Sequence, residues 1–351
     1  MSRTASRPVI AALATASLLA LAACGGHDKK PAAAPSPSAT SASPTASAQA
    51  APATCPLLGR PPTKGENRTR PAVAIKIDNV DIARPQTGIN HADVIFEETV
   101  EGGLTRLFAV FQCESAPVVG PIRSARTSDS DLIQLLKTAV FAYSGANGHV
   151  NARILSTPGA VALSYDTNGG LYYRSGSRPA PHNVYSSTSA LLKAGLAHSH
   201  KLKPPPPLFT YSNASPGGKV VRSIALRWSG FASAGWTWTG SGWNRTQNGS
   251  PDVLVGGTRV AVRNVIVMRI QTRYLGLRDV LGNASPDDVV TGQGPVWVFR
   301  NGHVIRGHWT RKHANSALRL RTARGRLIPL MPGRTWVELL PYSGSISVSR
   351  H

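Results

Sequence analysis

The sequence lacks the short motifs that mark common hydrolases and metal enzymes. It contains no G-x-S-x-G, S-x-x-K or H-E-x-x-H motif, no P-loop, and no cysteine and histidine set with zinc-site spacing. Its 351 residues include 3 cysteines, and 17 Asp and Glu stand against 39 Lys and Arg, for a formal net charge of +22. The common catalytic templates are therefore unsupported, and we expect neither a metal nor a cofactor.

The amino terminus has no apolar run long enough to cross a bilayer comfortably. Instead, Arg3 and Arg7 precede a short apolar run that ends at Leu21-Ala22-Ala23-Cys24, the pattern of a secretory signal. The last four residues match the lipobox of bacterial lipoproteins. We therefore expect a signal peptide over residues 1–23 and a lipidated Cys24 that anchors the protein outside the cytoplasm. The alternative is an ordinary secretory signal in which Cys24 is incidental.

The segment that follows is poor in large apolar side chains. Residues 31–54 are Ala, Pro, Ser and Thr with one Gln, and cannot bury enough apolar surface to offset the entropy of ordering. We predict a disordered tether over residues 24–68, and its segment 31–54 alone reaches about 30 Å from the membrane. The remaining cysteines, Cys55 and Cys113, can form a disulfide in an exported chain, although two unpaired thiols are equally consistent with spacing alone.

Positive charge is concentrated in the last part of the chain. Between residues 296 and 351, Glu338 is the single acid, and the basic residues are Arg300, Arg306, Arg311, Lys312, Arg319, Arg321, Arg324, Arg326, Arg334 and Arg350. An exported, anchored protein meets anionic lipids and wall polymers, so we expect an envelope partner and no nucleic acid. The alternative is a solvated basic face that serves solubility.

The folded part divides near the four prolines at residues 204–207. We predict an α/β or α+β domain over residues 69–207 and a mostly β domain over residues 208–351. In the first, the patterns predict strands at 73–77, 94–99 and 104–111, a turn at 101–103 and a helix at 129–143. In the second, Asn301-Gly302 predicts a two-residue hairpin turn.

Arginines cluster just before the predicted helix. Arg106, Arg123 and Arg126 could hold a phosphate or carboxylate, because guanidinium groups and backbone donors converge at a helix amino terminus. Arg178 is a fourth candidate, in the loop that also carries His182. The competing interpretation is an internal ion-pair network, in which the arginines are neutralised by Glu98, Glu101, Asp129 and Asp131.

Two residues are candidates for acid and base chemistry. His182 lies in a proline-rich loop where its ring could face a cleft, and Glu101 lies at the predicted turn. The alternatives are a hydrogen-bonded surface histidine and an exposed or ion-paired carboxylate. The sequence does not decide between these roles.

Several motifs resemble one known family. The stretch RPAVAIKIDNVDIARPQTGINHADVIFEETVEGGLTRLFAVF, then GPIRSAR and RPAPHNVY, and later GPVWVFRNGHVIRGHW and IPLMPGRTWVELLP resemble the YerB-like bacterial lipoproteins, a family with a domain of unknown function. The resemblance covers residues 71–341 and implies a two-part fold and a lipoprotein address. It marks further polar positions without giving them roles: Asp78, Asn79, Arg84 and Asn183.

Three functions are consistent with these features. We favour a lipoprotein that binds an anionic envelope polymer, glycan or protein partner without catalysis. The rival is an envelope hydrolase or transferase that uses His182 and Glu101 with the arginine anion pocket. The third is a scaffold protein, whose exposed apolar patch would come from the five tryptophans between Trp228 and Trp297 unless these form the core.

Overall fold

The computed structural model describes residues 54–214, 217–279 and 282–350. They belong to one compact unit, Ala50–His351. The predicted signal peptide, Cys24 and most of the predicted tether lie outside the described residues. Strands make up 42% and helices 14%, which confirms the predicted fold class, an α/β or α+β part followed by a mostly β part. Among the described residues, no helix is long and apolar enough to span a membrane.

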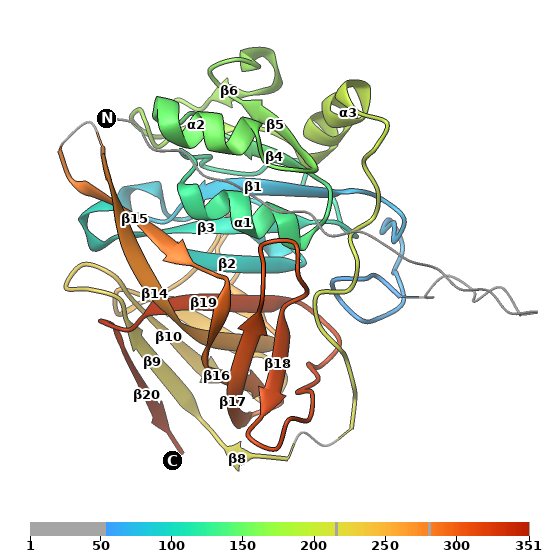
Figure 1. Cartoon of the computed structure of the whole chain (residues 1–351), viewed down its shortest axis with the longest axis vertical. Coiled ribbons are helices and arrows are strands. Elements are labelled where there is room, and N and C mark those ends of the chain that lie inside the picture. Colours follow the sequence, from blue (N-terminus) through green and yellow to red (C-terminus); the bar gives the residue numbers. More distant parts are fainter. Residues whose placement is uncertain (1–53, 215–216, 280–281, 351) are drawn as a thin grey trace, which may run out of the picture. The chain divides into compact units, whose positions relative to one another are not determined.

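Twelve of the described strands form one large sheet (Figure 1). Its order is β18 (Arg319–Thr322), β17 (His303–Arg311), β16 (Gly292–Arg300), β14 (Asn264–Arg278), β19 (Thr335–Pro341), β2 (Val94–Thr99), β3 (Thr105–Phe111), β1 (Ala72–Asp78), β4 (Ala139–Tyr143) and β5 (Ala160–Ser164), with β15 (Ala284–Val289) on β14 and β8 (Lys219–Val220) on β17. The parallel pairing of β19 with β2 joins strands from before and after the four prolines into one sheet.

A smaller sheet and three helices complete the layers (Figure 1). The six-stranded sheet has the order β12 (Ser250–Pro251), β11 (Trp243–Gln247), β10 (Ser233–Trp238), β9 (Ser223–Arg227) and β20 (Ser345–Ser349), with β13 (Ala261–Val262) on β11. The helices are α1 (Thr127–Leu135), α2 (Gly148–Leu155) and α3 (Thr188–His198). Short elements are β6 (Tyr173–Arg174) paired with β7 (Val184–Tyr185), and the 3-10 turns η1 (Asp81–Ala83), η2 (Ile89–His91), η3 (Glu101–Gly103) and η4 (Gly169–Leu171).

The large sheet separates two apolar cores, because successive side chains of a strand point to opposite faces. On β3, Leu107 and Ala109 pack in the core beneath the six-stranded sheet and α3, whereas Phe108 and Val110 pack in the core beneath α1 and α2. The sequence AVAIKID of β1 divides in the same way. Both faces of β1, β2 and β3 are therefore covered, so polar side chains on these strands are buried.

The five tryptophans between Trp228 and Trp297 belong to the first of these cores. Trp228, Trp236 and Trp243 are buried, and Trp238 and Trp297 are partly buried against the same cluster. They pack between the two sheets, where their large apolar surface is removed from water. They do not form the exposed patch that the scaffold hypothesis would require.

Two local predictions had different outcomes. The Asn301-Gly302 turn joins β16 to β17 with φ angles of 47° and 70°, as a two-residue hairpin requires. The predicted helix at 129–143 was wrong in its second half, because α1 ends at Leu135 and residues 139–143 form β4. β4 lies between β1 and β5 and is buried on both faces, so its apolar run carries no alternation that would distinguish a strand from a helix.

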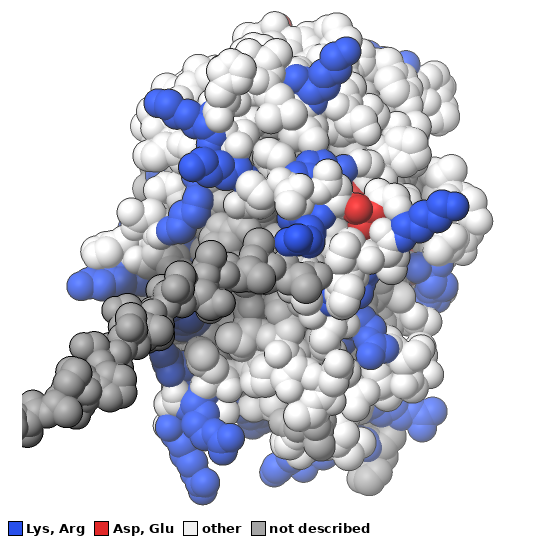
Figure 2. Space-filling model, turned by 90° about the vertical axis from the view of Figure 1, so that its right-hand side faces the viewer, with Lys and Arg blue, Asp and Glu red and all other residues white. Residues whose placement is uncertain are grey.

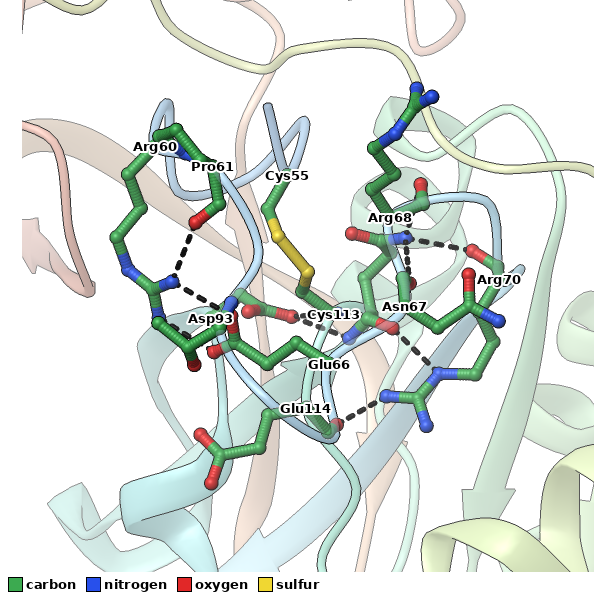
Figure 3. The surroundings of a disulfide bond; sticks show 12 residues. Cys55, Arg60, Pro61, Glu66, Asn67, Arg68, Arg70, Asp93, Cys113 and Glu114 are labelled. Carbon is green, nitrogen blue, oxygen red and sulfur yellow. Dashed lines mark hydrogen bonds and ion pairs between the residues drawn. A yellow bond between two sulfur atoms is a disulfide. The ribbon is translucent and has the colours of Figure 1, made fainter. Parts of the chain in front are cut away.

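A disulfide between Cys55 and Cys113 fixes the amino-terminal segment against the end of β3 (Figure 3). The two Cα atoms are 5.9 Å apart, and the residues are separated by 58 positions in the chain. Nearby, Arg60 pairs with Glu66 at 2.6 Å, and Arg70 Nε donates to the Gln112 carbonyl at 2.6 Å. These contacts hold the chain from Cys55 onward, so the predicted tether boundary at residue 68 was too late.

Candidate functional site

A cavity of about 470 Å³ opens at one edge of the large sheet. β1, β4 and β5 are parallel neighbours, and the residues at or after their carboxyl ends are Asp78, Ser144-Gly145 and Asp166. The last three of these residues line the cavity, and Asp78 holds one of its arginines. In open α/β sheets, ligands commonly bind outside the carboxyl ends of parallel strands. The cavity therefore occupies the place where this topology favours a ligand.

Guanidinium groups dominate the polar lining of the cavity. Five arginines contribute, from three separate parts of the chain: Arg106, Arg123, Arg126, Arg174 and Arg278. The carboxylates in the lining are those of Glu101, Asp166 and Asp279. Cations outnumber anions, so the cavity favours a ligand with net negative charge.

One arginine of the cavity is held by a carboxylate from the predicted turn. Arg126 Nε donates to Glu101 Oε2 at 2.8 Å, and the Ser285 hydroxyl donates to the other Glu101 oxygen. Burial disfavours the charged form of Glu101, yet the hydrogen bond and charge of Arg126 lower its pKa below the usual value. For this pair the ion-pair interpretation of the sequence is correct, and Glu101 is an ionised, fully engaged carboxylate.

A second arginine shares a carboxylate with the candidate histidine. Asp78 Oδ2 accepts from Arg123 Nε at 3.0 Å and lies 2.7 Å from His182 Nδ1. Burial opposes the ionisation of Asp78, but the hydrogen bond from His182 and the charges of Arg106 and Arg123 outweigh it and lower its pKa. His182 and the arginines are thus brought together through Asp78, at the rim where Pro181 lines the cavity.

The third arginine has no such partner. Arg106 lies on β3 opposite Asp78, and its side chain donates to the Ser124 carbonyl at 3.1 Å. Within the described residues, it makes no ion pair, and its Nε has no hydrogen-bond partner. Only 9% of Arg106 is exposed. Burial and the neighbouring charge of Arg126 lower its pKa to about 9, against the opposing charges of Asp78 and Glu101, so the site compensates this protonated cation incompletely.

The acids that were expected to neutralise Arg106 are occupied by a lysine. Lys76 Nζ is fully buried, lies 2.9 Å from Asp129 Oδ1 and also contacts Glu98. Burial lowers the pKa of Lys76 to about 8, against the opposing charge of Asp129. Asp131 instead faces Arg153 at 3.5 Å. The predicted ion-pair network therefore exists, but it is centred on Lys76 and leaves Arg106 out.

The fourth candidate arginine lies outside the cavity lining. Arg178 donates to the Tyr185 hydroxyl and to the Pro85 carbonyl, both at 2.6 Å, so it fixes the loop to the sheet edge. Asn183, from the same loop, accepts from Arg174 at 2.6 Å and thereby orients a cavity arginine. The predicted anion role of Arg178 has no support in this geometry.

Two further positions of the family pattern also make structural contacts. Asn79 donates to Glu97 Oε1 at 3.0 Å and to Thr105 Oγ1 at 2.8 Å, beneath the six-stranded sheet. Arg84 pairs with Asp81 at the surface. Neither residue lines the cavity.

Sequence reasoning missed four charged residues of the cavity, Asp166, Arg174, Arg278 and Asp279. Asp166 lies in the loop after β5 and Arg174 in the short strand β6, neither in a recognisable motif, and Arg278 and Asp279 come from the long β14–β15 hairpin of the second half. β15 contacts α1, η3 and β2, so this hairpin carries Arg278 to the first half of the chain (Figure 1). No local pattern could have predicted a contact across that sequence separation.

The sequence matches a family of unknown function over both halves of the fold. Residues 57–201 match the family described as "Protein of unknown function (DUF3048) N-terminal domain", and residues 224–337 match "Protein of unknown function (DUF3048) C-terminal domain". The chain belongs to this YerB-like family, as its motifs suggested. The two matched regions lie on either side of the four prolines.

One sequence relative and one crystal structure support the relationship. The chain is 27% identical over 312 residues to the Bacillus subtilis (strain 168) protein named "Putative lipoprotein YerB", covering 84% of this chain and 88% of that protein. It is also similar to the crystal structure of the YerB protein from Bacillus subtilis, with a TM-score of 0.70 and 25% identity, covering 83% of this chain and 98% of that one. Neither description assigns a ligand or a reaction.

Proposed function

We propose that this protein is an extracytoplasmic lipoprotein, anchored through Cys24, that binds an anionic group of the cell envelope in the arginine-lined cavity. The amino-terminal signal pattern and the name of the Bacillus relative support the anchor. The excess of guanidinium over carboxylate groups in the cavity supports an anionic ligand. The ligand class is a phosphate- or carboxylate-bearing wall polymer, a glycan or a protein partner.

Arg106 is the observation that carries this proposal. A buried guanidinium without a counterion is costly, because its desolvation is not repaid by a nearby opposite charge. Here Arg126 and Arg123 repel Arg106, and the charges of Asp78 and Glu101 offset the burial and repulsion only in part. A fold that keeps such a cation at an open cavity gains from an anion that enters it. A bound phosphate or carboxylate would accept charge-assisted hydrogen bonds from Arg106 and restore the missing pairing.

The surface charge supports the approach of an anionic partner. Figure 2 shows Lys and Arg side chains spread over one face of the molecule, with little Asp or Glu among them. Of the ten basic residues near the carboxyl terminus, Arg300 and Arg311 are buried and donate to backbone carbonyls. Most of the others are exposed, including Arg319, Arg321 and Arg326. Such a surface accelerates the encounter with polyanions but does not define a binding site.

The test is cosedimentation of the full-length, detergent-solubilised protein with purified wall sacculi. Arg106→Gln should reduce the bound fraction by about tenfold or more, since a charge-assisted hydrogen bond to the ligand is lost. Sacculi treated with hydrofluoric acid, which removes phosphodiester-linked polymers, distinguish phosphate from carboxylate ligands. Unchanged binding by Arg106→Gln would refute the cavity as the binding site.

A matched control separates the cavity from the general surface charge. The variant with Arg319, Arg321, Arg324 and Arg326 all changed to Gln removes four positive charges far more exposed than Arg106. We expect it to weaken binding mainly at low salt, because exposed charges are screened. If this variant loses binding at physiological salt while Arg106→Gln retains it, the basic surface is the binding site instead.

One observation favours the enzymatic alternative. His182 is oriented by Asp78 through Nδ1, which leaves Nε2 available as a general base. Glu101, the partner first considered, is held ionised by Arg126 and is unsuited to donate a proton. Incubating wall polymers with wild type and His182→Gln, and measuring released phosphate or reducing ends, tests this alternative. Equal release by both proteins would remove His182 from any catalytic role.

A further inference from the structure

The cavity also contains a carboxylate without a partner. Asp166 follows β5, is exposed and lines the cavity. Within the described residues, its carboxylate makes no hydrogen bond or ion pair, whereas Glu101 is bound to Arg126 and Asp279 accepts from Asn283. It approaches the backbone of Gly145 closely, since a Cβ atom at Gly145 would lie 2.4 Å from Asp166 Oδ2. An alanine there would fill the space that the carboxylate faces.

Asp166 and Arg106 are linked by a short path of backbone contacts. Arg106 donates to the Ser124 carbonyl at 3.1 Å, and the next residue, Ala125, donates to the Gly145 carbonyl at 3.0 Å. Gly145 in turn lies against Asp166. One cavity therefore presents a cation without an ion pair, Arg106, and a carboxylate without an ion pair, Asp166, among the described residues. The two have not neutralised each other, although they line the same cavity.

We propose that the ligand is zwitterionic at the group that enters the cavity, with a carboxylate or phosphate bound by Arg106 and a primary ammonium bound by Asp166. This inference rests on the proposed function and specifies its ligand class. A purely anionic group would satisfy Arg106 but would be repelled by Asp166. An ammonium group on the same ligand converts that repulsion into an ion pair. The cavity volume of about 470 Å³ suits a small end group of a larger molecule.

Two sources share this chemistry, and matched probes separate them. A peptide end carries an ammonium and a carboxylate, and an amine-bearing phosphodiester carries an ammonium and a phosphate. The peptide probes are alanyl-alanine and N-acetyl-alanyl-alanine, and the phosphate probes are phosphoethanolamine and N-acetylphosphoethanolamine. Within each pair, acetylation removes the ammonium charge and adds an acetyl group, and the Asp166→Asn variant separates these two effects. Titration calorimetry with the full-length protein in detergent measures all four affinities.

We expect the free-amine probe of one pair to bind roughly five- to tenfold more tightly than its acetylated form, as a partly exposed charge-assisted contact predicts. Asp166→Asn should abolish this preference without weakening the acetylated probe, and Arg106→Gln should weaken both forms. Asp81→Asn is the matched control, because Asp81 is an exposed carboxylate outside the cavity lining. It should leave all four affinities unchanged.

The outcomes distinguish this inference from the proposed function. Equal affinity for free and acetylated probes, or an amine preference that survives in Asp166→Asn, overturns the zwitterionic ligand. If these results accompany weaker binding by Arg106→Gln, the anion site stands. If no probe binds at millimolar concentration, the zwitterionic ligand is overturned for both sources, and the sacculus assay separately decides the anion site. Unfolding curves for each variant show whether a lost affinity reflects a lost fold.

Discussion

The buried carboxylates beneath the six-stranded sheet allow a quantitative prediction for Glu338→Gln. Glu338 is fully buried on β19, where its two oxygens accept from Trp236 Nε1 at 2.7 Å and Trp336 Nε1 at 3.1 Å. The cation that acts on Glu338 is Arg245, which pairs with Glu97 at 2.6 Å and with Asp252. One guanidinium cannot neutralise three carboxylates. Burial and the charge of Glu97 therefore raise the pKa of Glu338 well above its usual value.

The direction of the pH effect follows from this pKa. The folded protein keeps a proton on Glu338 at pH values where the unfolded chain has released it. Stability from this group therefore falls as pH rises above the unfolded pKa, by about 1.4 kcal/mol per pH unit while the folded state stays protonated. Glutamine mimics the protonated carboxyl: its amide oxygen accepts from Trp236, and its NH2 donates to Glu97. Trp336 Nε1 keeps Glu97 as an acceptor at 3.2 Å.

Urea unfolding of wild type and Glu338→Gln between pH 6 and pH 8 measures this effect. The free energy of unfolding of the variant, relative to that of wild type, should rise by up to roughly 3 kcal/mol between pH 6 and pH 8. Other buried acids with raised pKa values, such as Asp93 and Asp288, are present in both proteins and cancel in the difference. A difference that does not change with pH would show that Glu338 is ionised in the folded protein, and the reasoning would fail. Glu97→Gln is the contrasting control, because it removes the charge that raises the pKa of Glu338 and leaves Glu338 and Asp252 to pair with Arg245, so the fall in stability between pH 6 and pH 8 should become shallower.

Three further predictions concern the disulfide and the cavity. Cys113→Ser should lower the free energy of unfolding by about 4 kcal/mol, the loop-closure value for a separation of 58 residues, and no loss in urea unfolding would contradict it. Gly145→Ala should cost about 1–3 kcal/mol because φ there is +150° and the new methyl group meets Asp166; unchanged stability and ligand affinity would contradict this. Arg106→Gln should leave thermal stability unchanged or higher, and a loss above about 2 kcal/mol would indicate a structural role instead.

The first half of the fold could be predicted in part from local patterns. The alternation of apolar residues predicted β1. The apolar runs on either side of the turn at Glu101 predicted β2 and β3, and the two glycines after Glu101 predicted the turn that is η3. Alternation did not predict burial correctly where both faces of a strand are covered. Lys76 occupies an alternate position of β1 that reads as exposed, but α1 covers that face, so Lys76 is fully buried.

The candidate site was less predictable because its residues come from separate regions. The GPIRSAR motif brought Arg123 and Arg126 to attention, and EGGLTR did the same for Arg106 and Glu101. The sequence does not show that Lys76 is buried under α1 and pairs there with Glu98 and Asp129. Because these two acids are occupied, they are not available to the arginines. The domain boundary near residue 207 stays a prediction, since strands from both halves share one sheet.

Two buried arginines on opposite faces of this sheet show how structure separates architecture from binding. Arg245 is surrounded by Glu97, Asp252 and Glu338, so removing it would leave carboxylates unpaired and destabilise the fold. For Arg106, burial and the repulsion from Arg126 and Arg123 outweigh the attraction of Asp78 and Glu101, so removing it should cost the fold little. A buried charge without a counterion lowers the stability of the free protein. Such a charge is expected at a binding site, because the ligand supplies the missing counterion. A pair of measurements on Arg245→Gln and Arg106→Gln, one of stability and one of binding, should therefore give opposite results.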